Sequence, residues 1–377
     1  MSPETNYILQ SDQEIKQLEA PSLDYEPQLP KSYRPKIGLI GCGGITNHHL
    51  NAYKAAGLEV IGLCDLNEPK THERRDSHYP DATCYQDYHQ LLANPEIDVV
   101  DIALHPAPRV AAIEASLNAG KHVLSQKPFA LDLDVAERLS DLAQSKNLKL
   151  AVNQNGRWAP YVRYIQQAIN AGLIGETNTV NIYLNWDHTW IHGTPFETIH
   201  HIILYDFAVH WIDMAVNFFH SQSAERAFGT VRKAKNQLLE SPLLGGATIQ
   251  FSNGVANLAF DGQCTQGAQE RIVITGDKGV LTASGEVTKI SEVTLETNEG
   301  IATAQLDGSW FDDGFKGAML ELLCSIEEDR EPFNSAQNNL ATLASVYAII
   351  KSADNGNSVE VGENRQLGEN CQPRASE

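Results

Sequence analysis

The sequence contains no long run of apolar residues. No segment approaches the roughly 18 consecutive apolar residues that a membrane-spanning helix needs. The first ten residues, MSPETNYILQ, also lack the basic region and the apolar core of a secretory signal peptide. We therefore expect a cytoplasmic protein without a membrane partner.

Basic residues are scarce as well. Lys and Arg together number 28 against 48 Asp and Glu, which gives a formal net charge of −20. A surface of this charge repels a phosphate backbone on average. We expect no nucleic-acid partner.

The six cysteines are scattered, and no C-x-x-C pair occurs, so the usual spacings of zinc ligands and redox pairs are missing. No H-x-H or H-x-x-x-H pair with an obvious carboxylate ligand set precedes His210. We expect no metal site. The cysteines should be reduced and mostly buried; they are Cys42, Cys64, Cys84, Cys264, Cys324 and Cys371.

The chain does contain enough apolar residues for more than one core. Its 377 residues are 42% hydrophobic, and single cores stop growing near about 250 to 300 residues. Residues 1–34 carry four prolines among polar residues, which predicts an arm with at most a short turn at residues 13–18. The arm should wrap its own or a partner subunit. Its apolar anchors are Ile8, Leu9, Ile15, Leu18, Tyr25 and Tyr33.

Residues 36–65 have the pattern of a strand, a glycine turn, a helix and a second strand. Further apolar runs at residues 97–104, 122–124 and 148–153 alternate with helical stretches at 109–119 and 133–146. Such alternation predicts a doubly wound parallel sheet. We therefore predict an α/β domain with such a sheet at residues 35–155.

The pattern changes after Pro160. A helix at residues 161–171 and one strand precede a series of β-rich segments from Ala224 onward, and helices return at 317–330 and 337–355. This predicts an α+β domain at residues 156–361 with an open, mostly antiparallel sheet. Residues 362–377 form a polar tail. Because few helices remain to cover both faces of that sheet, we expect a homodimer or homotetramer.

A glycine turn, Gly41-Cys42-Gly43-Gly44, ends the first strand and precedes Ile45 and a helix. Such glycines let the backbone approach a pyrophosphate at a helix N-terminus, although an ordinary turn has the same residues. Asp65, at the end of the second strand, is spaced to accept hydrogen bonds from ribose hydroxyls. The turn and the carboxylate together predict dinucleotide binding.

The acidic residue favours NAD over NADP, because a carboxylate there repels a 2′-phosphate. Arg74 and Arg75 are the basic residues nearby that could favour NADP. The alternative, which we prefer, is that they belong to a solvated helix face.

Lys127 follows the buried-looking strand HVLS and precedes Pro128. The carboxyl end of a parallel strand faces the crevice where ligands bind. Lys127 is therefore a candidate catalytic and substrate-binding residue. The alternative is a surface lysine at a strand end.

Asp206, His210 and Asp213 are spaced to share one helix face. An imidazole one turn from a carboxylate can act as an oriented proton acceptor, so Asp206 and His210 are candidate catalytic and substrate-binding residues. The alternative is a structural histidine at a domain interface. Trp186 and His188 begin a segment rich in Trp and His, which suits a carbohydrate ring. Arg157 is a further candidate for substrate or cofactor, or else structural.

Four segments in order resemble the glucose-fructose oxidoreductase / inositol dehydrogenase / MocA family. These are KIGLIGCGGIT, AGKHVLSQKPFA, VNQNGRWAPYVRYIQQAINAGLIGE and YDFAVHWID, between about residues 36 and 361. The resemblance implies a Rossmann domain, a C-terminal sheet used for oligomerisation, and NAD(P)-linked oxidation or reduction of a sugar or polyol hydroxyl.

Two departures from the family pattern lie where the nicotinamide ribose and ring are expected. Gln126 replaces the usual glutamate before the lysine, and Leu104-His105 stands where the family has a T-P-N segment. We include Leu104, His105, Gln126 and Lys127 among the expected cofactor contacts. Two other functions stay open: an NAD-binding sensor without catalysis, and an NAD-dependent glycoside-cleaving enzyme without net redox change.

Overall fold

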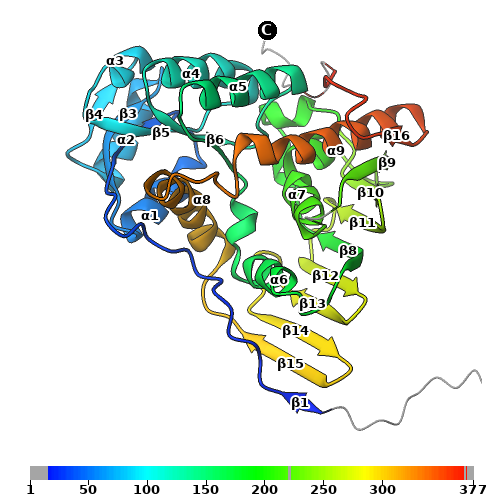
Figure 1. Ribbon diagram of the computed structural model, residues 1–377. Coiled ribbons are helices and arrows are strands. Elements are labelled where there is room, and N and C mark those ends of the chain that lie inside the picture. The colour runs from blue at the N-terminus through cyan, green and yellow to red at the C-terminus, as the bar shows by residue number, and fades with distance from the viewer. Residues whose placement is uncertain (1–15, 220–221, 369–370, 372–377) are drawn as a thin grey trace, which may run out of the picture.

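A computed structural model describes residues 16–219, 222–368 and 371, and their backbone forms two β-sheets (Figure 1). One sheet has six strands and the other ten. The six-stranded sheet is built from residues 36–153, and the ten-stranded sheet from residues 177–305 together with short strands near both ends of the described chain. This is the predicted fold class, a parallel α/β unit followed by an open β-sheet unit.

All neighbouring strands of the smaller sheet are parallel, in the order β4-β3-β2-β5-β6-β7. The order reverses between β2 and β5, and ligands of doubly wound sheets bind beyond the carboxyl ends of the strands at such a point. The strands are β2 (Lys36–Ile40), β3 (Glu59–Cys64), β4 (Thr83–Tyr85), β5 (Ile97–Ile102), β6 (His122–Gln126) and β7 (Leu150–Asn153).

The connections between these strands carry α1 (Thr46–Ala55), α2 (Glu68–His78), α3 (Tyr88–Leu92), α4 (Pro106–Asn118) and α5 (Leu133–Ser145). A helix from far along the chain, α8 (Trp310–Glu327), also packs on this sheet beside α1. Its Phe315, Met319 and Leu323 share a buried cluster with Ile37 and Leu39 of β2. The C-terminal part of the chain therefore completes the core under the parallel sheet.

The larger sheet runs β1-β15-β14-β13-β12-β8-β11-β10-β9-β16. Its pairs are antiparallel except β8 with β11 and β1 with β15. The strands are β1 (Gln17–Leu18), β8 (Thr177–Asn185), β9 (Ala224–Arg232), β10 (Leu244–Phe251), β11 (Gly254–Asp261), β12 (Gln269–Gly276), β13 (Gly279–Gly285), β14 (Glu292–Thr297), β15 (Gly300–Gln305) and β16 (Val359–Glu360).

One face of the larger sheet is covered by helices α6 (Pro160–Asn170), α7 (Val209–Phe218) and α9 (Ala336–Asn355) (Figure 1). Burial alternates along the strands, as it does for a sheet with one covered face. On the other face Tyr183 is 46% exposed and Phe228 44% exposed, and both line a shallow hollow with Thr248 and Arg271. The described chain leaves this face without a covering layer.

The N-terminal arm runs along its own chain from the parallel sheet to the far edge of the larger sheet (Figure 1). Glu327 accepts hydrogen bonds from the backbone N–H groups of Lys31, Ser32 and Tyr33, and Pro21 accepts one from the Tyr164 hydroxyl. The predicted turn at residues 13–18 is wrong for Gln17–Leu18, which pair with β15 as a strand. Residues 13–15 and the anchors Ile8, Leu9 and Ile15 lie outside the described residues.

Helix α8 begins seven residues before the predicted start at 317, because Ser309 caps it by accepting a hydrogen bond from Asp312 N–H. Gly314 and Gly317 hid the first seven residues of this helix from the sequence pattern. Gly317 has a packing role: a Cβ there would lie 2.2 Å from Cγ of Trp158. The side chain of Trp158 therefore packs directly on the helix backbone.

Candidate active site

The glycine turn lies between β2 and α1, at the carboxyl edge of the parallel sheet. Gly41 has φ +95°, and a Cβ there would lie 2.7 Å from the carbonyl oxygen of Ala103, so only glycine fits without strain. At Gly43 and Gly44 a Cβ would meet open space. Ile45 is 39% exposed, and no side chain caps the start of α1. The turn therefore leaves room for a diphosphate at the helix N-terminus.

Asp65 follows β3 directly, beside this turn. Its carboxylate accepts hydrogen bonds from the backbone N–H groups of Cys42 and Asn67, both at 2.8 Å. These contacts fix the carboxylate next to the glycine turn, where the sequence analysis placed it. The residues present fit the adenosine half of a dinucleotide.

Arg74 does not lie on a solvated helix face, so that interpretation is wrong. It is 6% exposed, and its guanidinium donates to the Thr46 hydroxyl at 3.1 Å and to the Gly43 carbonyl oxygen at 3.2 Å. The residue therefore tethers α2 to the glycine turn. The sequence pattern did not predict this contact, because 28 residues separate Arg74 from Thr46.

Lys127 follows β6 and reaches from the parallel sheet to the second unit. Its ammonium donates to the backbone oxygen of Asp206 at 2.8 Å and lies 3.3 Å from the Asp206 carboxylate. The two side chains are 17% and 18% exposed. The structure therefore brings together two predicted site residues that are 79 positions apart.

Arg109 is a site residue that the sequence analysis missed. It is 1% exposed and donates to the backbone oxygens of Leu104 and Pro128, and so ties the loop after β5 to the loop after β6. Desolvation lowers the pKa of Arg109 to about 10, and the guanidinium stays charged at neutral pH. Neighbouring His105 is exposed and stands at the N-cap position of α4 without a side-chain capping hydrogen bond.

The segment with Asp206 and His210 is not one regular helix, which corrects that prediction. Residues Ile203–Phe207 form a π-helical turn, and α7 begins at Val209. His210 Nδ1 is buried without a hydrogen-bond partner. Desolvation, and then the charge of Lys127, hold the pKa of His210 well below its ordinary value of 6.5. The imidazole is therefore neutral at physiological pH and close to Lys127.

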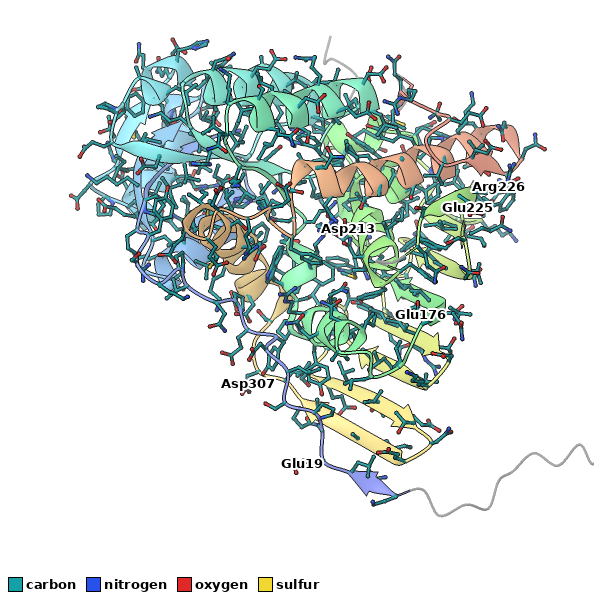
Figure 2. All side chains as sticks on the ribbon, viewed as in Figure 1. Glu19, Glu176, Asp213, Glu225, Arg226 and Asp307 are labelled. Atoms are coloured by element: carbon teal, nitrogen blue, oxygen red, sulfur yellow. The ribbon has the colours of Figure 1, made fainter. Side chains whose placement is uncertain are left out.

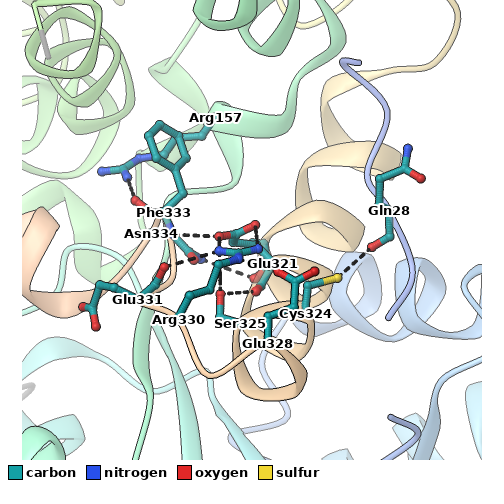
Figure 3. Close-up of polar contacts among 11 residues, drawn as sticks. Gln28, Arg157, Glu321, Cys324, Ser325, Glu328, Arg330, Glu331, Phe333 and Asn334 are labelled. Atoms are coloured by element: carbon teal, nitrogen blue, oxygen red, sulfur yellow. Dashed lines mark hydrogen bonds and ion pairs between the residues drawn. The ribbon is translucent and has the colours of Figure 1, made fainter. Parts of the chain in front are cut away.

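Arg157 and Asp213 form a buried ion pair away from this cluster. Arg157 Nε and Nη2 donate to the two Asp213 carboxylate oxygens at 2.7 and 2.6 Å. Nη1 donates to the Phe333 carbonyl oxygen, as Figure 3 shows, and to Asn338. Figure 2 shows Asp213 in the interior of the molecule, whereas Glu225 and Arg226 lie at the edge of the molecule. All three guanidinium nitrogens are engaged, so Arg157 is corrected from a substrate-binding to a structural residue.

Aromatic rings line the segment before the π-helical turn. The Phe207 ring lies 3.8 Å from that of His188 and 6.1 Å from that of Trp190, which is 58% exposed. The predicted residue Trp186 packs edge-on against His188 at 5.1 Å. Burial lowers the pKa of His188 to about 4, so this ring too is neutral. The exposed Trp190 and the rings that pack against it therefore form an apolar surface beside Asp206 and Lys127.

Two further expectations concern Gln126 and metal binding. Gln126 is 7% exposed, and both ends of its amide contact protein groups, so its side chain is not open to a cofactor.

His200, His201 and Asp354 place potential ligand atoms within 4.8 Å of one another, a grouping that the spacing in the sequence did not predict. In the structure His201 Nε2 is 2.7 Å from an Asp354 oxygen, which ties the loop before Asp206 to α9.

Comparisons with known proteins give the same fold and type of site. A family described as an oxidoreductase family with an NAD-binding Rossmann fold matches residues 35–154, and the GFO/IDH/MocA C-terminal domain matches residues 162–282. The chain belongs to the Gfo/Idh/MocA family. The resemblance found in the sequence is thereby confirmed.

Relatives of this Gfo/Idh/MocA protein carry names of sugar and inositol dehydrogenases. D-apiose dehydrogenase of Paraburkholderia graminis is 24% identical over 87% of this chain and 90% of its own. An inositol 2-dehydrogenase/D-chiro-inositol 3-dehydrogenase of Lactiplantibacillus plantarum is 25% identical over 86% of this chain and 92% of its own.

Solved structures share the fold. A levoglucosan dehydrogenase in complex with NADH and levoglucosan has a TM-score of 0.75 at 19% identity, over 87% of this chain and 100% of its own. An oxidoreductase from Agrobacterium radiobacter in complex with NAD+, L-tartaric acid and magnesium has a TM-score of 0.77 at 20% identity, over 88% of this chain and 99% of its own. No helix in the described ranges is long and apolar enough to cross a membrane.

Proposed function

We propose that this protein is an NAD-dependent dehydrogenase that oxidises a secondary hydroxyl of a sugar, inositol or related cyclic polyol. The observation that carries the proposal is the contact of Lys127 with Asp206, beside the neutral His210, at the edge of the sheet that holds the glycine turn. Bound there, the nicotinamide ring supplies the acceptor for the hydride of the substrate carbon.

His210 is the proposed base. A hydroxyl that gives up hydride from its carbon must also lose its proton, and a neutral imidazole can accept it. Lys127 donates a hydrogen bond to the reacting oxygen and stabilises the developing negative charge. Asp206 orients the Lys127 ammonium and a neighbouring substrate hydroxyl.

The contacts near Asp65 favour NAD. Its carboxylate is fixed beside the glycine turn and would repel a 2′-phosphate. Gly41, Gly43, Gly44 and Ile45 would hold the pyrophosphate at the start of α1, while Leu104 and His105 border the nicotinamide half. An NADPH preference of about tenfold or more in kcat/KM would contradict this assignment.

Aromatic rings favour a ring-shaped, uncharged substrate. Trp190 and Phe207 offer apolar faces for the C–H groups of a sugar or cyclitol, while Lys127, Asp206 and His210 bind its hydroxyls. Arg109 and Arg157 are both committed to protein oxygens, so neither guanidinium is available to a substrate. The apolar rings and the three polar groups together favour a polyol.

A panel of inositols, aldoses and glycosides, assayed for NADH formation and for sugar release, separates this function from the other two. NADH formation with a cyclic polyol supports the dehydrogenase. Sugar release without NADH would identify a glycoside-cleaving enzyme. NAD binding without either product would identify a sensor.

A further inference from the structure

A buried polar network lies directly behind Lys127, and the proposed chemistry does not use it. It consists of Gln126 at the end of β6, His49 and Tyr53 on α1, and Asp101 in β5, all 7% exposed or less. Lys127 N–H donates to Gln126 Oε1 at 2.7 Å, and Gln126 Nε2 lies 3.1 Å from His49 Nε2. His49 Nδ1 and the Tyr53 hydroxyl are each 2.7 Å from Asp101 Oδ2.

The donors and acceptors permit one arrangement of protons. A backbone N–H can only donate, so the oxygen of the Gln126 amide must face Lys127 and its NH₂ group must face His49. His49 Nε2 must then accept, which places the ring proton on Nδ1, where it donates to the Asp101 carboxylate. In this arrangement the His49 ring carries its proton on Nδ1 and presents Nε2 as an acceptor to Gln126.

The other groups packed around His49 leave this assignment unchanged. Burial and the nearby Asp101 raise the pKa of Tyr53 well above its ordinary value, so the phenol remains a donor. Desolvation lowers the pKa of the adjacent His48. From the other elements, α8 contributes the ring of Phe315 at 4.6 Å and β7 contributes the Asn153 amide, whose Nδ2 is 3.5 Å from His49 Nε2.

We propose that Gln126, His49 and Asp101 are positioning residues that fix the backbone of Lys127 through a buried chain of hydrogen bonds in which His49 Nε2 is the acceptor. The inference rests on the proposed function for the role of Lys127 and adds how that lysine is held. Because Lys127 contacts Asp206 across the two sheet units, a shift of its backbone would move the ammonium relative to the reacting oxygen. A misplacement of about 1 Å can cost about 100-fold in rate.

The substitution Gln126→Glu tests whether His49 Nε2 is the acceptor of the Gln126 amide. A glutamate keeps the acceptor for Lys127 N–H but turns a second oxygen toward His49 Nε2, where two acceptors repel unless an extra proton binds. We expect Gln126→Glu to be close to wild type at acidic pH and to lose about 10- to 100-fold in kcat as that proton dissociates on the alkaline side. The matched variant Gln126→Met removes both hydrogen bonds and should lower kcat about equally at every pH.

Imidazole NMR of ¹⁵N-histidine-labelled protein tests the same claim without turnover. We expect wild-type His49 to show the tautomer with its proton on Nδ1, and Gln126→Glu to show one additional bound proton that is lost as the pH rises. A charged His49 in the wild type, or parallel pH–rate profiles for Gln126→Glu and wild type, would overturn the proposal. If no polyol is oxidised, the proposed function fails, but the NMR spectra still test the hydrogen-bond arrangement at His49. The wild-type spectrum tests it even if a variant does not fold.

Discussion

Lys127 is positioned through contacts at both its backbone and its ammonium. Gln126 accepts from its N–H, and Asp206 accepts from its Nζ. The strand end and the following Pro128 were enough to single out Lys127 in the sequence. The roles of Arg109, Arg74 and the Arg157–Asp213 pair could not be assigned from the sequence. Arg109 contacts Pro128 19 residues away, Arg74 contacts Thr46 28 residues away and Arg157 contacts Asp213 56 residues away, and only the tertiary fold brings these partners together.

Replacement of the proposed catalytic groups should affect rate more than cofactor binding. General acid–base groups contribute about 10²- to 10⁴-fold, so Lys127→Ala and His210→Ala should each lose about that much kcat while NAD affinity stays near wild type. Steady-state kinetics and NAD titration measure the two effects, with the exposed Lys235→Ala as control. If His210→Ala turns over a verified substrate within about threefold of wild type, the histidine is structural.

The pH dependence of kcat should reflect the lowered pKa of His210. The neutral, proton-accepting form exists above that pKa, which desolvation and Lys127 hold well below 6.5. Activity should therefore stay constant as the pH falls through 6.5 and decline only at lower pH. A pH–rate profile with an acidic limb centred at or above 6.5 would show that another group is the base.

Elements whose signals are local were predictable, and elements shaped by packing were not. Strands β2, β3, β5, β6 and β7 and helices α5 and α9 have regular patterns, and the prediction matches them within a few residues, whereas the short strand β4 was not predicted. The π-helical turn at Ile203–Phe207 interrupts a sequence that reads as one helix. The sequence pattern placed the start of α8 at Gly317, but the helix begins at Trp310, and the glycine lies within it where Trp158 packs against the helix backbone.

The arm should be held to α8 by the carboxylate of Glu327. Hydrogen bonds from the Ser32 hydroxyl and from the backbone N–H groups of residues 31–33 lower the pKa of Glu327 to about 2. Glu327→Gln should therefore speed hydrogen exchange at the amides of residues 31–33, and Glu328→Gln, which removes a partner of Arg330, should not.

The sign of the pH effect follows from the depressed pKa. The stabilisation is complete above the ordinary value of 4.5 and is lost as the pH falls toward 2. Wild-type protection of these amides should accordingly persist at pH 5. Equal exchange in Glu327→Gln and wild type at neutral pH would show that the arm is held by other contacts.

At the scale of the whole molecule, one face of the ten-stranded sheet has no covering layer in the described part of the chain. Its helices cover one side, and Tyr183 and Phe228 remain exposed on the other. The sequence predicted this open sheet from its alternation and its lack of helices. It could not predict that α8 returns to the parallel sheet, because an amphipathic helix does not specify which sheet it covers.

Self-association through this face is the expected consequence. Tyr183→Lys combined with Phe228→Glu should convert a dimer or tetramer into smaller species, because charged groups would then have to be desolvated in the interface. Light scattering at tens of micromolar measures the change, and thermal unfolding with retained NAD binding controls for folding. A wild-type monomer under these conditions would contradict the proposed oligomer.

Hydride transfer from a cyclic polyol is the central claim, and one assay tests it most directly. Purified protein is incubated with NAD and a panel of inositols and pyranoses, and NADH absorbance is followed for wild type and for Lys127→Ala. We predict NADH formation with at least one cyclic polyol by the wild type and its loss by about 100-fold or more in the variant. NADH formation that is unchanged in Lys127→Ala, or NAD binding with no NADH formed from any member of the panel, would contradict the account.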